Sequence, residues 1–231
     1  MTTDRRLALT AGLLYLATFA TSFPGLALRT AFFDGDAAPA TAGSAALVEL
    51  LLAAACVGTA LALFPIARRV SLPLALGFVV SRTLEAAMIM TGVLALLATA
   101  AVRAAGGGDD ALVALHDASF LVGPAFMSAT NALLLGSVMF RGRLVPRVIP
   151  LIGLIGAPLL LASSIGVLFG AWTQTSAVGA IAAVPVALWE LALGVWLTVR
   201  GVAPGIPRPA DHGPRGISPA SDDRHGMTRG T

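Results

Sequence analysis

The sequence contains no lysine and little charge of either sign. All fifteen basic side chains among its 231 residues are arginine, and charged residues make up only 12% of the chain. A soluble domain carries about a quarter charged residues. With 57% hydrophobic residues, the chain has too little polar surface to face water on every side. These proportions exclude an ordinary soluble domain and indicate an integral membrane protein. The partner that the sequence predicts is therefore the lipid bilayer.

Cysteine is almost absent, and the residue patterns of common catalytic sites are missing. The one cysteine, Cys56, lies inside an apolar run, so it cannot form an internal disulfide and is expected to pack as a small apolar side chain. The sequence has no HExxH zinc motif, no GxSxG nucleophile motif, no phosphate-binding loop and no CxxC pair. We therefore expect no enzyme activity, no metal site and no cofactor.

Six apolar runs are each long enough to cross a bilayer, whose hydrocarbon core is about 30 Å thick. They span Leu7–Leu28, Ala42–Ala67, Leu72–Val102, Ala111–Phe140, Val148–Gly170 and Ala177–Val199. A secretory signal peptide would begin like the first run, but the five runs that follow favour an uncleaved first helix. The sequence thus predicts an all-α fold, a six-helix transmembrane bundle over residues 1–200.

Arginine is unevenly distributed between the two sides of these runs. Eight arginines fall on the side that holds both ends of the bundle, and only Arg29 and Arg103 fall on the other side, together with four aspartates. Because arginine is enriched on the cytoplasmic side of membrane proteins, we expect a multi-pass protein of the cell membrane with both termini in the cytoplasm. The arginines form no single basic patch, so the isoelectric point near 10.4 does not indicate nucleic-acid binding.

Two segments have the composition of irregular chain. Residues 29–41 contain Asp34, Gly35, Asp36 and Pro39, which predicts a loop. Residues 201–231 are rich in proline, glycine, arginine and aspartate and have almost no apolar content, which predicts a disordered cytoplasmic tail.

Four polar side chains lie deep inside the predicted spans, where each needs a partner or a water-filled cavity because charge in hydrocarbon is costly. They are Arg82, Glu85, Asn131 and Glu190. Arg82, Asn131 and Glu190 are each about ten residues from the arginine-rich side, which places them about 15 Å deep and near the midplane. Glu85 lies one turn further along the same helix face as Arg82.

Matching depth and opposite charge predict that Arg82 contacts Glu190 and shares its forked donors with Glu85, with Asn131 in hydrogen-bonding reach. The alternative is that Arg82 snorkels to the cytoplasmic interface and leaves Glu190 protonated, but about 15 Å is too far for one side chain without local thinning of the bilayer. The cluster itself has two interpretations. It is either an ion-pair group that fixes helix packing or a polar binding site of the kind that transporters use.

Three further polar residues, Glu49, His116 and Asp117, are expected nearer the outer ends of their spans. His116 and Asp117 could form half of a metal site or part of a proton relay. The simpler interpretation, which we favour, is a solvated helix start with an aspartate near the positive end of the helix dipole.

Several short motifs, most of them in the second half of the chain, resemble a known family. They are His116–Asp117, Phe120–Pro124, Asn131–Gly136, Met139–Arg147, Gly156–Leu159 and Leu188–Gly194, with weaker matches at Ala11–Leu16 and Ser81–Ala86. Together they resemble the bacterial domain-of-unknown-function family 4386 over roughly residues 5 to 203. The resemblance implies a polytopic membrane protein without an established activity, so it supports the architecture and adds nothing on mechanism.

Three classes of function are compatible with the sequence: a small transporter with its site at the Arg82 cluster, a structural or sensory protein that acts through partners, and an intramembrane enzyme. The enzyme is disfavoured, because no set of nucleophile and base or of metal ligands is present. A non-catalytic membrane subunit is our first expectation and a small transporter is the alternative. A cavity that reaches Arg82 and Glu190 would favour transport, whereas a sealed and fully paired cluster would favour the structural role.

Overall fold

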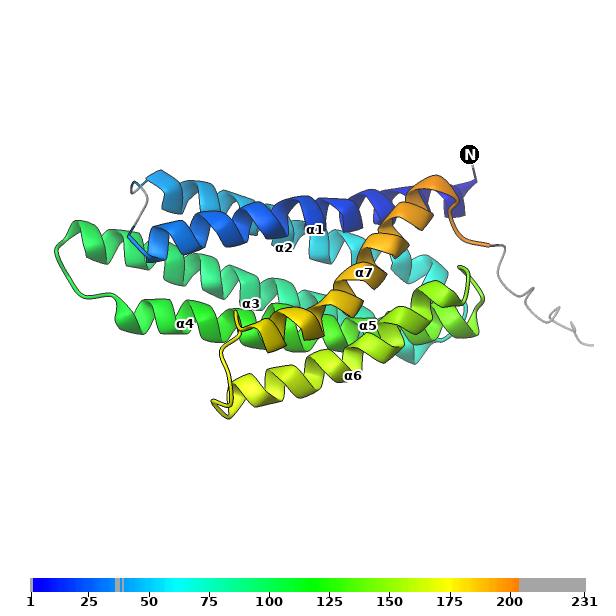
Figure 1. Ribbon diagram of the computed structural model, residues 1–231. Helices are drawn as coiled ribbons and strands as arrows, with labels where there is room; N and C mark the ends of the chain where they lie inside the picture. Colours follow the sequence, from blue (N-terminus) through cyan, green and yellow to red (C-terminus); the bar gives the residue numbers. More distant parts are fainter. Residues whose placement is uncertain (1, 36–37, 39, 204–231) are drawn as a thin grey trace, which may run out of the picture.

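The computed structural model describes residues 2–35, 38 and 40–203, and every regular element within these residues is a helix (Figure 1). The elements are α1 (Thr3–Phe33), α2 (Ala40–Ala67), α3 (Leu72–Ala104), α4 (Asp110–Phe120), the π-helix η1 (Leu121–Met127), α5 (Ser128–Arg141), α6 (Val148–Leu168) and α7 (Ala177–Val199). Since α4, η1 and α5 follow one another without a break, the described residues contain six helices long and apolar enough to cross a membrane. The predicted all-α, six-span architecture is confirmed over these residues.

The first helix is longer than the sequence predicts. It begins at Thr3, where the Thr2 hydroxyl accepts a hydrogen bond from the Arg5 backbone N–H, and it ends at Phe33. Residues 28–33 contain neither glycine nor proline, so nothing stops the helix before Gly35, whose positive φ of 83° ends the turn. The predicted loop therefore begins later than expected, and Arg29 is a helical residue.

The fourth span is interrupted, although the sequence predicts one continuous helix over Ala111–Phe140. Its middle, Leu121–Met127, is a π-helix that contains Pro124. Proline has no N–H to donate to the preceding turn and clashes with the carbonyl there. The wider π turn relieves this conflict without ending the helix, and segments of this kind occur frequently at functional sites.

The helices alternate in direction along the bundle, and α7 crosses it obliquely (Figure 1). We call the end that holds Arg5, Arg68, Arg141 and Arg200 the arginine end, and the opposite end the far end. At the arginine end α7 packs against α1, and towards the far end it lies beside α6. The largest apolar core fills the arginine half of the bundle, around Tyr15 and Trp189.

Contacts at the arginine end hold the first helix, α1, against the last helix, α7. A Cβ atom at Gly12 of α1 would collide with Thr198 and with the Gly194 carbonyl of α7, so glycine allows these two backbones to approach. The Arg5 guanidinium donates hydrogen bonds to the carbonyl oxygens of Leu197, Thr198 and Val199 at 2.7–3.2 Å. It thereby caps the carboxyl end of α7, where cations are favoured.

The loop between α2 and α3 is tied to the same end of the bundle. The Arg69 guanidinium donates two hydrogen bonds to the Asp4 carboxylate, at 2.6 and 2.8 Å. This exposed contact raises the pKa of Arg69 above its ordinary value, chiefly through the hydrogen bonding to Asp4. The guanidinium therefore stays charged across the accessible pH range.

Residues 201–203 continue past α7 in contact with the bundle. The Ala203 backbone N–H donates to the Leu144 carbonyl oxygen at 2.8 Å, and Gly201 adopts a positive φ of 78° beside Arg5. The chain predicted to be a tail from residue 201 is thus in contact with the bundle over its first three residues. The rest of that prediction concerns residues 204–231, which lie outside the described residues.

The helices differ in length, so their turns at the far end lie at two different distances from the arginine end. At 1.5 Å per residue, the 21 residues of α6 rise about 32 Å, and the 33 residues of α3 rise about 50 Å. Both helices start at the arginine end, so the α3–α4 hairpin extends past the α6–α7 turn, as Figure 1 shows. Of these two helices, only α6 has a length that matches a hydrocarbon core of about 30 Å.

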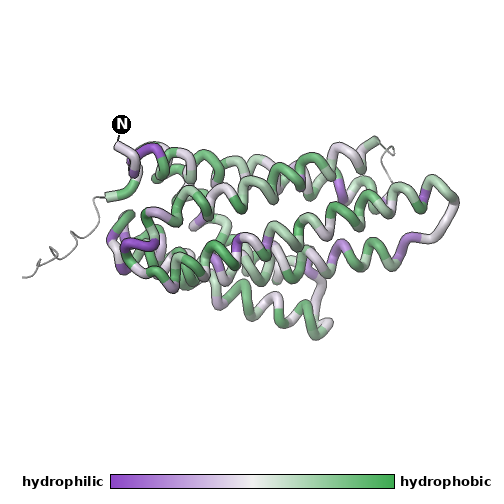
Figure 2. The backbone as a smooth tube through the Cα atoms, turned by 180° about the vertical axis from the view of Figure 1, so that it is seen from behind, coloured by the Kyte–Doolittle hydropathy of each residue, from purple (hydrophilic) through white to green (hydrophobic). Residues whose placement is uncertain are grey.

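The outer surface of the bundle is apolar along its length. Figure 2 shows hydrophobic residues along the helices and hydrophilic residues gathered mainly at the two ends. Large apolar side chains such as Leu94 (69% exposed), Ile181 (71%) and Phe169 (82%) face outward. A continuous apolar surface of this extent would be unstable in water, so the protein is embedded in a membrane.

Candidate functional site

The structure brings together the four polar residues predicted near the midplane, which we call the central cluster: Arg82, Glu85, Asn131 and Glu190. Arg82 and Glu85 lie one turn apart on α3, and their Nη1 and Oε2 atoms are 2.6 Å apart. Arg82 Nη2 lies 3.5 Å from Glu190 Oε1 on α7. The contact between Arg82 and Glu190 that matching depth predicts is therefore present.

Two hydroxyl groups complete the cluster, and sequence reasoning did not single them out. The Arg82 Nε–H donates to Thr59 Oγ1 of α2 at 3.3 Å. Ser128, at the start of α5, donates its hydroxyl to Glu85 Oε1 at 2.9 Å. Serine and threonine are common in membrane helices, where they bond to their own backbone. In the sequence, only depth within the span could have distinguished Thr59 and Ser128 from the other serines and threonines.

The two carboxylates of the cluster have different surroundings. Glu85 accepts hydrogen bonds from Arg82, from Ser128 and from the Asn131 side-chain amide, which lies 2.7 Å from Oε2. Among the described residues, by contrast, Glu190 Oε1 and Arg82 Nη2 have no hydrogen-bond partner, although both atoms are buried. Glu85 is therefore held in place by its hydrogen bonds. At Glu190, the Arg82 Nη2 donor and the Glu190 Oε1 acceptor are available to form hydrogen bonds with a ligand.

The central cluster carries unequal charge. One guanidinium faces two carboxylates, so the group has a net charge of −1 when all three side chains are ionised. Arg82 is 1% exposed and Glu85 is 4% exposed, and unbalanced charge at such sites is expensive. A proton or a bound cation would balance it.

A cavity of about 200 Å³ reaches the cluster from the side; we call it the side cavity. Its polar wall is formed by Arg82, Glu85, Ser128 and Glu190. Its other walls are largely apolar and come from α1, α2, α3, η1, α6 and α7, with Thr18, Phe19, Ser22, Phe23, Leu52, Cys56, Ile89, Pro124, Leu160, Ala183, Val186 and Ala187. The arrangement suits a small molecule that has an apolar body and one polar group.

The π-helix shapes this site. Gly123 packs so closely on α3 that a Cβ atom there would lie 2.6 Å from the Met88 Cβ and 3.3 Å from the Glu85 carbonyl oxygen. Pro124 lines the cavity, and Ser128 follows one residue after the π turn ends. The irregular segment therefore sets the position from which Ser128 reaches Glu85.

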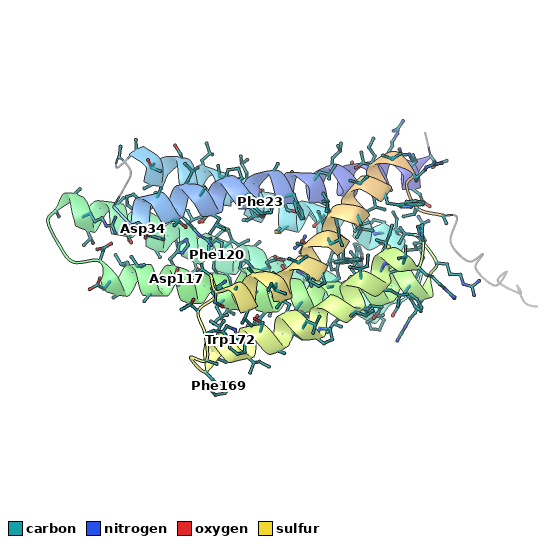
Figure 3. All side chains as sticks on the ribbon, viewed as in Figure 1. Phe23, Asp34, Asp117, Phe120, Phe169 and Trp172 are labelled. Carbon is teal, nitrogen blue, oxygen red and sulfur yellow. The ribbon has the colours of Figure 1, made fainter. Side chains whose placement is uncertain are left out.

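The three outer polar residues lie in a second group, the far cluster, with Arg29. Glu49 Oε1 lies 3.4 Å from Arg29 Nη1 and 3.5 Å from His116 Nε2, while His116 Nδ1 is 3.7 Å from Asp117 Oδ1. The His116 ring stacks on Phe120 with ring centroids 4.6 Å apart. Figure 3 shows Asp117 and Phe120 on α4 and Asp34 at the end of α1, all towards the far end.

The expectation that His116 lies at a solvated helix start is wrong. Helix α4 begins at Asp110, so His116 is almost two turns inside it, and the residue is fully buried between Phe33 and Phe120. The Asp117 side chain is 72% exposed, as a solvated residue would be. Consecutive helical positions point in different directions, and this separates the buried histidine from the exposed aspartate.

No three His, Cys, Asp or Glu side chains converge as a metal site requires anywhere within the described part of the chain. In the far cluster, the Arg29 guanidinium approaches the same Glu49 oxygen that faces His116. The Arg29 charge balances that carboxylate, so Glu49 has no unbalanced negative charge to offer a divalent metal ion.

Comparison with known proteins places the chain in a family. The family model described as "Domain of unknown function (DUF4386)" matches residues 10–201. No curated protein matches the chain, and no solved structure does. The match covers every residue of the central cluster and most of the six spans. This multi-pass membrane protein therefore belongs to the domain-of-unknown-function family DUF4386.

Proposed function

We propose that this protein is a small membrane carrier, which binds a small molecule in the side cavity and passes it across the bilayer. The observation that carries the proposal is the cavity itself, which ends at an Arg82–Glu190 contact with one free donor and one free acceptor among the described residues. Transporters place polar sites near the bilayer midplane. A bundle that used these charges only to lock its helices would be better served by a dry and fully paired contact.

The helices around the cavity contain features that support movement. Pro24 lies in α1 beside the cavity residue Phe23, Pro185 lies in α7 beside Val186, and Pro124 lines the cavity from the π-helix. Each proline removes a hydrogen bond from its helix and permits a bend there. A carrier must change the access to its site, and these are the positions where α1, η1 and α7 can bend.

A non-catalytic membrane subunit that works through protein partners is the second candidate, and a different observation favours it. Glu85 has hydrogen bonds to groups on α3 and α5, as expected for a group that fixes helix packing. Neither candidate includes a chemical reaction, in keeping with the lack of catalytic motifs in the sequence.

We further propose that the arginine end faces the cytoplasm of a cell with the protein in its plasma membrane. Arginine enrichment on that side supports this orientation. In a Cys56→Ala background, Thr173→Cys in the α6–α7 turn should react with a membrane-impermeant maleimide added outside intact cells, and Ser71→Cys at the arginine end should not. The reverse pattern would invert the orientation.

Cys56 offers a test of the carrier function without a known ligand, because it is the one cysteine of the chain and lines the cavity. A carrier opens its site to water on at least one side during its cycle. The wild-type protein in sealed vesicles should therefore react with a water-soluble, cationic methanethiosulfonate reagent added to one side or the other. Mass spectrometry of the intact protein measures the extent of modification.

Thr83→Cys in the Cys56→Ala background is the matched control. Thr83 lies next to Arg82 at the same depth but is exposed on the outer surface of α3. A thiol surrounded by lipid is poorly ionised and should stay unmodified. Modification of Cys56 alone supports the carrier. Protection of Cys56 from both sides would instead favour the non-catalytic subunit.

A further inference from the structure

We propose that the ligand of the side cavity is a small lipophilic amine, bound as its ammonium form beside Glu190, and that it enters from the bilayer between α1 and α7. This assignment rests on the carrier function proposed above and names its substrate class. It follows from the charge, the hydrogen-bonding groups, the volume and the opening of the cavity.

Charge favours a cation over an anion. The polar wall contains two carboxylates and one guanidinium, and the guanidinium is already 2.6 Å from Glu85. An ammonium group would bring the group to neutrality. A carboxylate ligand would raise the negative charge in a region of low dielectric constant, where like charges repel strongly. The contact of Glu190 with Arg82 is the looser one, at 3.5 Å, so Glu190 is the carboxylate that can receive the cation.

The hydrogen-bonding groups that line the cavity are mostly acceptors, and Arg82 Nη2 is a donor without a partner among the described residues. The Thr18 hydroxyl donates to the Tyr15 carbonyl and the Ser22 hydroxyl donates to the Thr18 carbonyl, both at 2.7 Å, so each hydroxyl oxygen is left as an acceptor. Ser128 likewise uses its proton on Glu85. Glu190 Oε1 is an acceptor without a partner among the described residues. An ammonium group, which has three donors and no acceptor, complements this set.

Volume limits the apolar part of the ligand. The cavity holds about 200 Å³, and a cavity of about 150 Å³ in another protein holds one benzene ring. An aromatic ring with a one-carbon or two-carbon amine arm is therefore close to the largest ligand that fits without rearrangement. Phe19, Leu52, Ile89 and Leu160 provide the apolar surface for such a ring.

The opening of the cavity lies towards the lipid. An apolar layer that includes Leu52, Ile89 and Phe120 separates the cavity from the far cluster. The large apolar core around Trp189 closes the route to the arginine end. The exposed cavity residues are Ser22 and Phe23 on α1, at the level where α7 has diverged from α1 (Figures 1 and 3). A ligand dissolved in the membrane reaches the site without crossing either apolar layer.

Three ligands that share a benzyl group and differ in their polar group test the assignment: benzylamine, benzyl alcohol and phenylacetate. Isothermal titration calorimetry on the protein in lipid nanodiscs, with empty nanodiscs subtracted, should show saturable binding of benzylamine. Benzyl alcohol should bind at least about tenfold more weakly, because it lacks the charge that Glu190 receives. Phenylacetate should not bind. Equal affinities for all three, tighter binding of phenylacetate, or no saturable binding of benzylamine would overturn the proposal.

Two variants locate the site and the entrance. Glu190→Gln should weaken benzylamine binding by at least about tenfold while leaving that of benzyl alcohol little changed. Ala187→Trp, on the α7 wall, should abolish benzylamine binding by filling the cavity, whereas Ile181→Trp on the outer surface of α7 should not. Benzylamine should also slow the modification of Cys56 in the wild-type protein, a readout that needs no variant to fold. If benzylamine does not slow the modification of Cys56, the amine binds outside the side cavity and the proposal is overturned.

These results separate the two proposals. If Cys56 reacts from one side of the membrane but benzylamine neither binds nor protects it, the carrier function stands and the amine assignment fails. If Cys56 is unreactive from both sides and benzylamine does not bind, both fail.

Discussion

Arg82 Nη2 and Glu190 Oε1 face each other across 3.5 Å, from α3 and α7, and neither atom has a hydrogen-bond partner among the described residues. On its other side, Arg82 holds Glu85 at 2.6 Å. The guanidinium therefore has one tight contact that serves the fold and one loose contact at the wall of a cavity. This asymmetry supports the proposed carrier over an ion pair whose only role is packing.

Removing the guanidinium should destabilise the protein strongly. Arg82→Ala leaves two buried carboxylates without a cation, and breaking a buried ion pair costs about 3–5 kcal/mol. Adding Glu190→Gln removes one of these charges, so the double variant should be more stable than Arg82→Ala alone. Unfolding by sodium dodecyl sulfate in mixed micelles measures both free energies. A double variant that loses the sum of the two single losses would show that the residues do not interact.

Asn131 should tolerate loss of its amide better than conversion to a charge. Its side-chain N–H donates to Glu85 Oε2 at 2.7 Å in a fully buried position. Asn131→Leu should cost about 1.5–3 kcal/mol, the range for a hydrogen bond to a charged group. Asn131→Asp has nearly the same shape but places a further carboxylate beside Glu85, so it should cost more. If the aspartate variant is as stable as the wild type under the same unfolding assay, the described contact is wrong.

Close packing of the π-helix on α3 should make Gly123 intolerant of a side chain. A Cβ atom would lie 2.6 Å from the Met88 Cβ, and overpacking of this kind costs about 1–3 kcal/mol. Gly43→Ala on α2 is the control, because nothing lies within 4 Å of its Cβ position. There, the alanine should be neutral or should stabilise by up to about 1 kcal/mol. Equal effects of the two substitutions on thermal stability would argue against the close approach.

The neighbouring arginines Arg5 and Arg6 should differ although they carry the same charge. Arg5 caps the end of α7 with hydrogen bonds to Leu197, Thr198 and Val199, whereas Arg6 is exposed. Arg5→Ala should cost about 1–2 kcal/mol of stability, and Arg6→Ala should cost less than about 0.5 kcal/mol. Both remove one positive charge from the same side of the membrane. An equal loss of stability in the two variants would therefore indicate that the charge, and not the hydrogen bonds to the end of α7, is responsible.

The spans could be predicted because apolar length is a sufficient signal for a membrane helix. Depth along each span likewise brought Arg82, Asn131 and Glu190 to one level, and charge then predicted their contact. What depth does not contain is direction around the helix axis. That missing information explains why His116, nearly two turns inside α4, is buried between aromatic rings while Asp117 faces outward.

Local departures from the regular helix could not be predicted in the same way. Pro124 is visible in the sequence, but a kink, a helix end and a π turn all accommodate a proline. Here the π turn accompanies the close approach of Gly123 to α3, a tertiary contact that the sequence does not show. Thr59 and Ser128 were missed for a related reason, since their roles depend on which groups the neighbouring helices present to them.

The measurement that tests the central claim most directly compares the rate of Cys56 modification in the wild-type protein and in Ala187→Trp, with Ile181→Trp as the control. If the side cavity is a ligand site that the carrier opens to water during its cycle, the tryptophan at position 187 should slow the reaction of Cys56 by at least about tenfold, as loss of a preformed pocket would. The substitution at position 181 should leave the rate unchanged. Equal rates in all three proteins would contradict the account, because Cys56 would then be reached by a route other than the cavity at Arg82 and Glu190.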